Sequence, residues 1–99
     1  MKLIDILPPE NTDSDAPGGS KKRVLEHLSH FLADRMTGID ADEIYLGLLA
    51  RERLGSTGIG EGIAIPHCRM ASCEKITGAL LRLSDPVDFD AIDAGPVDL

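Results

Sequence analysis

Aromatic residues are scarce in this 99-residue chain, which contains one tyrosine, two phenylalanines and no tryptophan. Its core must therefore be built from Leu, Ile, Val and Ala, and at this length it can belong to only one small domain, spanning residues 1–99. No apolar run approaches the roughly 20 residues of a transmembrane helix. The opening MKLID also lacks the basic region and continuous apolar stretch of a signal peptide.

Basic residues and cysteines are also few. Ten Lys and Arg stand against seventeen Asp and Glu, for a net charge of −7, which argues against binding to nucleic acid or to an anionic membrane surface. A disulfide between the two cysteines, Cys68 and Cys73, would close a very short loop, and nothing indicates an oxidising compartment. We therefore expect two free thiols and a cytoplasmic location.

Two amphipathic helices are predicted in the first half of the chain. Ser20 is a suitable N-cap for the first, and Gly38 ends it. Its apolar face is Val24, Leu25, Leu28, Phe31 and Leu32. Asp40 and Glu43 resemble a capping box at the start of the second helix, which Gly55 ends. Its apolar stripe is Ile44, Leu48 and Leu49.

Loops are predicted on both sides of these helices. Residues 8–19 are dense in Pro, Gly and short polar side chains, and the apolar residues just before them could form a short strand or a docked turn: Ile4, Ile6 and Leu7. Residues 55–62 hold four glycines in eight positions, which predicts neither a helix nor a regular strand.

Short strands are predicted in the second half. Residues 63–65 are β-prone and end at Pro66, and residues 76–83 have the pattern of a buried strand. A short edge strand is expected around Val87 and Phe89, and residues 96–99 begin another alternating pattern. Helices followed by strands, with a Gly-rich connector between them, indicate an α/β or α+β domain.

The main candidate site lies around His67, at the end of the predicted strand 63–65. Neutral imidazole is a nucleophile near pH 7, and a phosphoryl group on it needs donors. The Gly-rich segment offers backbone N–H groups and the hydroxyls of Ser56 and Thr57, and Arg51 lies near the end of the preceding helix. Taken alone, however, such a segment is more often a simple turn, and such a histidine is more often structural or merely exposed.

A longer motif surrounds this histidine. Glu52 is followed, after six positions, by Ile59-Gly60, and after two more by residues 63–67 (IAIPH) and the small residue Cys68. This resembles the active-site signature of the fructose/mannitol-type enzyme IIA family of the bacterial phosphotransferase system. Three further runs resemble its nitrogen-regulatory branch: SKKRVLE (20–26), RERLGSTGIG (51–60) and DPVDFD (85–90). The resemblance covers almost the whole chain, and it implies an α/β fold with a mixed β-sheet flanked by helices.

The resemblance implies a phosphoryl carrier. His67 would accept the group, on Nε2 in this family, from an HPr-type histidine phosphocarrier protein. Arg51 would be its charge partner, with Ser56 and Thr57 beside it, and the transfer would need no metal or organic cofactor. The output would be regulatory, through partners such as a kinase or an ion transporter. A sugar-transport enzyme IIA passing phosphate to an enzyme IIB, or a module that only binds proteins, remain alternatives.

The resemblance also implies that this chain corresponds to the N-terminal two-thirds of the family's domain. The C-terminal part, with more core and a second active-site histidine, would be missing. An uncovered sheet edge and apolar face favour association. We therefore expect an incomplete domain whose open face is covered by another chain through self-association, with a loose, partly ordered chain as the remaining alternative.

Other polar clusters point less clearly to function. His27, His30 and Asp34 have helical spacing, but a solvated face with a His30–Asp34 pair explains them better than a metal site. The two cysteines with His67 lack a fourth zinc ligand and the usual spacing. The last cluster is most simply a solvated edge and turn that could also help to select partners: Asp85, Asp88, Asp90 and Asp93.

Overall fold

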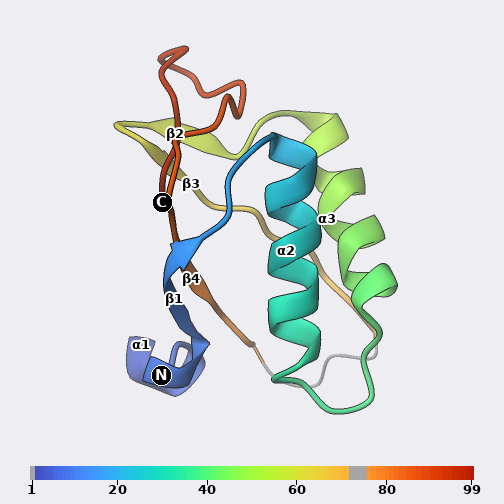
Figure 1. Cartoon of the computed structure of the whole chain (residues 1–99). Helices are drawn as coiled ribbons and strands as arrows, with labels where there is room; N and C mark the ends of the chain where they lie inside the picture. The colour runs from blue at the N-terminus through green and yellow to red at the C-terminus, as the bar shows by residue number, and fades with distance from the viewer. Residues whose placement is uncertain (1, 72–75) are drawn as a thin grey trace.

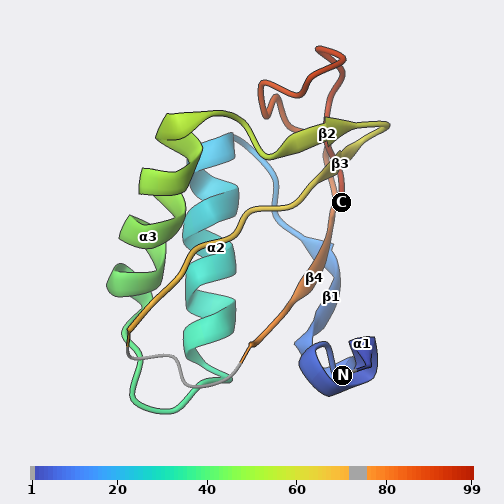
Figure 2. The same ribbon diagram turned by 180° about the vertical axis from the view of Figure 1, so that it is seen from behind.

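The computed structural model describes residues 2–71 and 76–99. Two helices and two small sheets make up its main body (Figures 1 and 2). The elements in chain order are α1 (Leu3–Ile6), a 3₁₀ turn (Pro9–Asn11), β1 (Thr12–Ala16), α2 (Lys21–Ala33), α3 (Ala41–Leu54), β2 (Gly58–Gly60), β3 (Ile63–Ala64) and β4 (Leu80–Leu83). The predicted mixed α/β class is confirmed.

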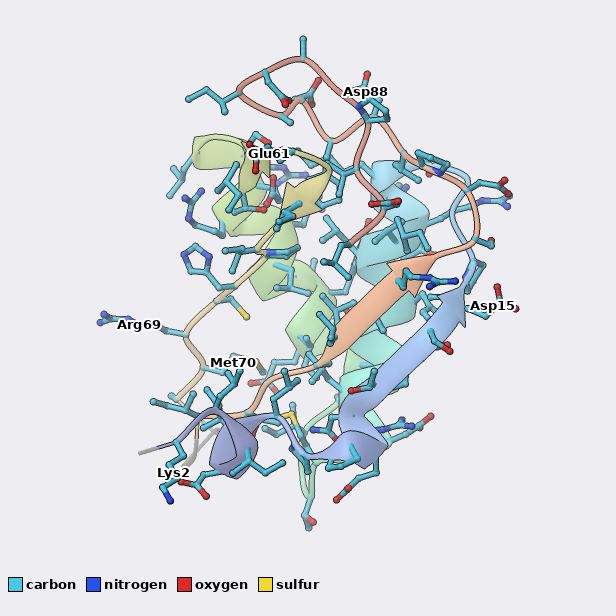
Figure 3. All side chains as sticks on the ribbon, turned by 90° about the vertical axis from the view of Figure 1, so that its left-hand side faces the viewer. Lys2, Asp15, Glu61, Arg69, Met70 and Asp88 are labelled. Carbon is cyan, nitrogen blue, oxygen red and sulfur yellow. The ribbon has the colours of Figure 1, made fainter. Side chains whose placement is uncertain are left out.

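Helices α2 and α3 run antiparallel and form one layer of the molecule (Figure 1). Strands β1 and β4 lie side by side in front of that layer when the molecule is viewed from the strand side (Figure 3). The core between the layers is aliphatic except for two buried phenylalanines, as the composition predicts, and its largest fully buried side chains are Phe89, Leu25, Ile44 and Val97. No helix in the described part of the chain is both long and apolar enough to cross a membrane.

Helix α2 begins where the sequence predicts and ends earlier. The Ser20 hydroxyl accepts a hydrogen bond from the Arg23 N–H at 3.2 Å, as an N-cap does. The predicted end at Gly38 is wrong, since the helix stops at Ala33. The guanidinium of Arg35 explains the early stop, because it turns back onto the Phe31 ring and donates to the Phe31 carbonyl at 3.0 Å.

Helix α3 has the predicted limits but not the predicted cap. Asp40 occupies the N-cap position and Gly55 the C-cap position. The Asp40 side chain makes no capping hydrogen bond, so the capping box predicted with Glu43 does not form through it. Ile44 and Leu48 are buried as expected, and Leu49 is partly buried against the core.

The loop predicted at residues 8–19 contains a strand. β1 pairs in parallel with β4, with Thr12 opposite Leu80 and Asp13 opposite Leu81. Only Ala16 of β1 is buried, so the strand forms because β4 offers backbone partners and not because of its own composition. The preceding residues form the short helix α1 in place of the strand or turn expected there.

The strand predicted at 76–83 is shorter in the structure than in the prediction: β4 covers only Leu80–Leu83. Before it, Gly78 bonds elsewhere: its N–H donates to the Ile6 carbonyl at 2.7 Å, and its carbonyl accepts from the Asn11 amide at 2.9 Å. Burial alternates along β4, so one of its faces is exposed and it is not buried on both sides.

The last residues of the described chain join the two sheets. Val87 and Val97 form an isolated antiparallel bridge, which is all that forms of the predicted edge strand. The Asp98 carbonyl accepts from Leu83 at 2.8 Å, and the Asp98 N–H donates to Gly62 at 3.0 Å. Residues 97–99 therefore lie between β4 and the β2–β3 hairpin.

Candidate functional site

His67 follows β3 on an extended segment that crosses in front of the helices in Figure 2. Its side chain is exposed, and its ring Nδ1 lies 3.0 Å from the Ile65 carbonyl oxygen. Pro66, between them, is partly buried and restricts the backbone of this turn.

This contact determines which ring nitrogen is free. A carbonyl oxygen can only accept a hydrogen bond, so Nδ1 must carry the hydrogen. In the neutral imidazole of His67, the lone pair is then on Nε2. The Ile65 carbonyl therefore holds Nδ1 and fixes this tautomer.

Ser56 is engaged in structural hydrogen bonds. Its hydroxyl donates to the Phe89 carbonyl at 2.5 Å and accepts from the Gly58 N–H at 3.0 Å. Ser56 therefore ties the segment after α3 to the segment around Phe89. Its predicted role beside a phosphoryl group stays a prediction.

Thr57 is buried and also engaged, with Glu52 as its partner. Its hydroxyl donates to Glu52 Oε1, and its N–H donates to Glu52 Oε2 at 3.2 Å. The same Oε2 lies 2.8 Å from the Lys21 ammonium. The Glu52 side chain is only 4% exposed, so this is a charged pair inside the protein that carries its own hydrogen bonds.

Arg51 lies at the end of α3, as predicted, and one of its guanidinium nitrogens donates to the Gly55 carbonyl at 2.8 Å. A cation at this position interacts favourably with the partial negative charge at the C-terminal end of α3. The hydrogen bonds of the described residues join Arg51 to Gly55 and His67 to Ile65, not to each other. The other guanidinium donors are not committed by this bond, so the role of Arg51 as a charge partner stays a prediction.

The Gly-rich segment, where the sequence predicts neither a helix nor a regular strand, contains a short strand with irregular pairing. Gly58–Gly60 is β2, and it pairs with β3 with a shift in register. Gly58 is buried, and a Cβ on it would lie 2.9 Å from both Cα and Cβ of Ala91. Here glycine permits close packing between two segments, which is the physical reason why a short strand forms in this segment.

The segment that carries His67 packs on α3 through Cys68. A Cβ on Gly47 would lie 3.0 Å from the Cys68 sulfur, so the absent side chain makes room for the thiol. Cys68 is a thiol that takes part in no disulfide, as predicted. Cys73 lies outside the described residues.

A cavity of about 620 Å³ adjoins the site. His67 and its neighbours line one side, and apolar side chains of α2 and α3 line the other, including Leu28, Leu32 and Leu48. Arg69, at the rim, points away from the body of the molecule (Figure 3).

The histidines of α2 pair differently from the prediction. Nε2 of His27 lies 3.3 Å from Asp13 on β1, so His27, and not His30, has a carboxylate partner. His30 and Asp34 are exposed, and the pair predicted between them does not form. Among the described residues, no cluster of three or more metal-ligating side chains is present.

The acidic residues after β4 are exposed, as predicted, and two of them accept backbone hydrogen bonds in loops. Asp88 accepts the Asp90 N–H at 3.0 Å. Asp93 accepts the N–H groups of Glu61 and Gly95, each at 3.0 Å, and these bonds hold the pKa of Asp93 below its ordinary value. The Glu61 contact joins the β2–β3 turn to this loop; Glu61 and Asp88 are labelled in Figure 3.

Sequence reasoning missed two residues that support the site. Glu52 was noted only as a motif position, yet it follows the buried Ile44 and Leu48 at four-residue intervals on the same helix face. A carboxylate on an apolar stripe signals a paired charge. Gly47 is a glycine inside a helix, which is unfavourable without a packing reason.

A family model and two related proteins of known name match nearly the whole chain. The family model described as "Phosphoenolpyruvate-dependent sugar phosphotransferase system, EIIA 2" matches residues 5–99. A nitrogen regulatory protein of Pseudomonas aeruginosa is 52% identical over 99 residues, which are all of this chain and 64% of that protein. A fructose-specific EIIA component of a phosphotransferase system, from Haloferax volcanii, is 35% identical over 97 residues, or 98% of this chain and 63% of that protein.

A solved structure is also similar. The crystal structure of the nitrogen regulatory protein IIA-Ntr from Neisseria meningitidis has a TM-score of 0.91 and 44% identity, over 98% of this chain and 66% of that one. The chain thus spans 63–66% of the length of these three relatives.

Proposed function

The chain belongs to the phosphoenolpyruvate-dependent sugar phosphotransferase system EIIA 2 family, and from this premise we propose that it carries a phosphoryl group on Nε2 of His67. The observation that carries the proposal is the 3.0 Å contact between Nδ1 and the Ile65 carbonyl, which leaves Nε2 as the nucleophile on an exposed ring. The donor is a phosphohistidine on an HPr-type carrier protein.

The transfer is a simple displacement at phosphorus. The Nε2 lone pair of His67 forms the new N–P bond while the N–P bond to the carrier's imidazole breaks, and that electron pair stays with the carrier. Nδ1 keeps its hydrogen, so no proton has to move at His67. The phosphorylated ring is more positive, which strengthens the hydrogen bond from Nδ1 to Ile65.

The phosphoryl oxygens need donors, and Arg51 is the proposed charge partner. Its present bond to Gly55 uses one of five guanidinium donors, and the end of α3 is joined to β2 by only a short segment. Ser56 and Thr57 are better explained as structural residues, because their hydroxyls are already bonded to Phe89 and Glu52.

The proposed output is regulation in the cytoplasm rather than sugar uptake. The relative from Pseudomonas aeruginosa and the similar solved structure are both named nitrogen regulatory proteins, at 52% and 44% identity, whereas the fructose-specific relative is 35% identical. The phosphorylation state of His67 would then control docking to a partner protein such as a kinase or an ion transporter. Transfer to a sugar-specific enzyme IIB is the second candidate, which the fructose-specific relative favours.

The test is phosphorylation in a purified relay. Incubation with phosphoenolpyruvate, enzyme I and an HPr-type carrier should add one acid-labile phosphate to the chain. His67→Ala should accept none, while His30→Ala, which changes an exposed histidine on α2, should accept phosphate at the wild-type rate. Label on His67→Ala, or no label on the wild type, would contradict the proposal.

A further inference from the structure

A continuous series of hydrogen bonds leads from a buried carboxylate to the imidazole of His67. Glu52 accepts both the N–H and the hydroxyl of Thr57. The Thr57 carbonyl accepts the Ile65 N–H at 3.0 Å. The Ile65 carbonyl accepts Nδ1–H of His67 at 3.0 Å. Backbone groups and the short Thr57 side chain form the middle of the series, so little conformational freedom separates the two ends.

The carboxylate end of this series is held firmly. Glu52 lies on the core-facing side of α3, and its Oε2 also bonds the Lys21 ammonium of α2 at 2.8 Å. Thr57 is 5% exposed, so its bonds to Glu52 have little competition from water. Two helices therefore determine the position of Thr57, and Thr57 in turn determines the position of the Ile65 backbone.

The Ile65 backbone is the element that acts on His67. The hairpin around it is weak by itself, because β3 has two residues and its pairing with β2 is irregular. The Ile65 side chain is 56% exposed and cannot anchor the residue by burial. The bond from Ile65 to Thr57 is therefore an important restraint on the carbonyl that holds Nδ1.

We propose that Glu52 is a positioning residue for His67, acting through Thr57 and Ile65 to keep the neutral ring in its Nδ1–H tautomer. This inference rests on the proposed phosphoryl transfer for its functional meaning. Glu52 contacts Lys21 and Thr57, not the imidazole, so it is no acid or base in the reaction. Its effect is to keep the Nε2 lone pair available for attack.

The tautomer can be measured without phosphorylation. Long-range ¹H–¹⁵N spectra distinguish Nδ1–H from Nε2–H imidazole, and they should be recorded about two pH units above the ordinary imidazole pKa of about 6.5. The variants are Glu52→Gln, which removes the charge, and the pair Thr57→Val and Thr57→Ser, which removes or keeps the hydroxyl. Asn11→Ala is the control, because it removes a buried side-chain bond to Gly78 outside this series.

The expected result is a specific change at His67. Glu52→Gln and Thr57→Val should shift the ring toward Nε2–H and slow phosphorylation by about tenfold, which equals about 1.4 kcal/mol. Thr57→Ser and Asn11→Ala should keep the wild-type tautomer, even where they lower stability. If Glu52→Gln does not fold, the Thr57 pair decides the question.

Two outcomes separate this inference from the proposed function. An unchanged tautomer in folded Thr57→Val and Glu52→Gln would overturn the positioning role, even if His67 is phosphorylated. A shifted tautomer in a chain whose wild type accepts no phosphate would uphold the positioning of the ring and refute the phosphoryl transfer.

Discussion

Lys21→Met should destabilise the fold strongly, although the side chain lies at the start of a helix. The Lys21 ammonium lies 2.8 Å from Glu52 Oε2 and 3.4 Å from the Phe89 carbonyl, and 4.8 Å from the centre of the Phe89 ring. It therefore joins α2 to the end of α3 and to the segment after β4. Methionine keeps the aliphatic length of the side chain and removes only the charge and its donors.

The expected loss can be worked from these contacts. Removing one partner of a buried ion pair costs about 3–5 kcal/mol. Here the cost is lower, because Lys21 is 22% exposed and Glu52 keeps two donors from Thr57. The lost cation–π contact adds roughly 0.5 kcal/mol, and Asp90, 78% exposed, adds almost nothing. We expect a loss of about 2–3 kcal/mol in unfolding free energy, or about 10–20 °C in Tm for a domain of this size.

Urea unfolding followed by far-UV circular dichroism measures this loss. The matched control is Lys22→Met, which makes the same change at the next, exposed residue of α2 and should stay within about 0.5 kcal/mol of wild type. In Lys21→Met/Glu52→Gln the two effects should be less than additive, because each single change disrupts the same pair. A Lys21→Met variant as stable as its Lys22 control would refute the reasoning.

Three further outcomes are expected. Arg51→Ala should slow transfer to His67 by about 10–100-fold, since a charge-assisted donor contributes about 1.5–3 kcal/mol; an unchanged rate in a folded variant would show that the guanidinium acts elsewhere. Gly58→Ala should cost about 1–3 kcal/mol in thermal unfolding, because its Cβ would meet Ala91 at 2.9 Å; a neutral effect would place Ala91 away from β2. Asp93→Asn should make the free energy of unfolding depend less on pH below about pH 4. The pKa of Asp93 in the folded protein is below the ordinary 3.8, so its stabilisation is present above about pH 4 and is lost as pH falls through the folded pKa. Equal acid limbs in variant and wild type would contradict that account.

The limits of the helices show which features of the fold can be predicted from local sequence patterns. The start of α2 follows from the Ser20 cap, the end of α3 from Gly55, and the start of α3 from its periodic apolar residues, all of which are local signals. The end of α2 does not, because the Arg35 guanidinium that bonds the Phe31 carbonyl also bonds the Glu10 carbonyl at 2.7 Å, and the Glu10 contact spans 25 positions of the chain. β1 was missed for a similar reason, since its partner β4 lies more than sixty positions away.

The candidate site divides in the same way. The sequence by itself determined the family, through a motif of residue types at set spacings from Glu52 to Cys68, and predicts His67 within it as the phosphoryl acceptor. Only the tertiary structure decided what the neighbouring polar groups bond to. The hydroxyls of Ser56 and Thr57 look like free donors in the sequence, but Phe89 and Glu52 already accept their hydrogen bonds. Motif spacing is a property of neighbouring positions, whereas burial and partner choice depend on which distant segments the fold brings together.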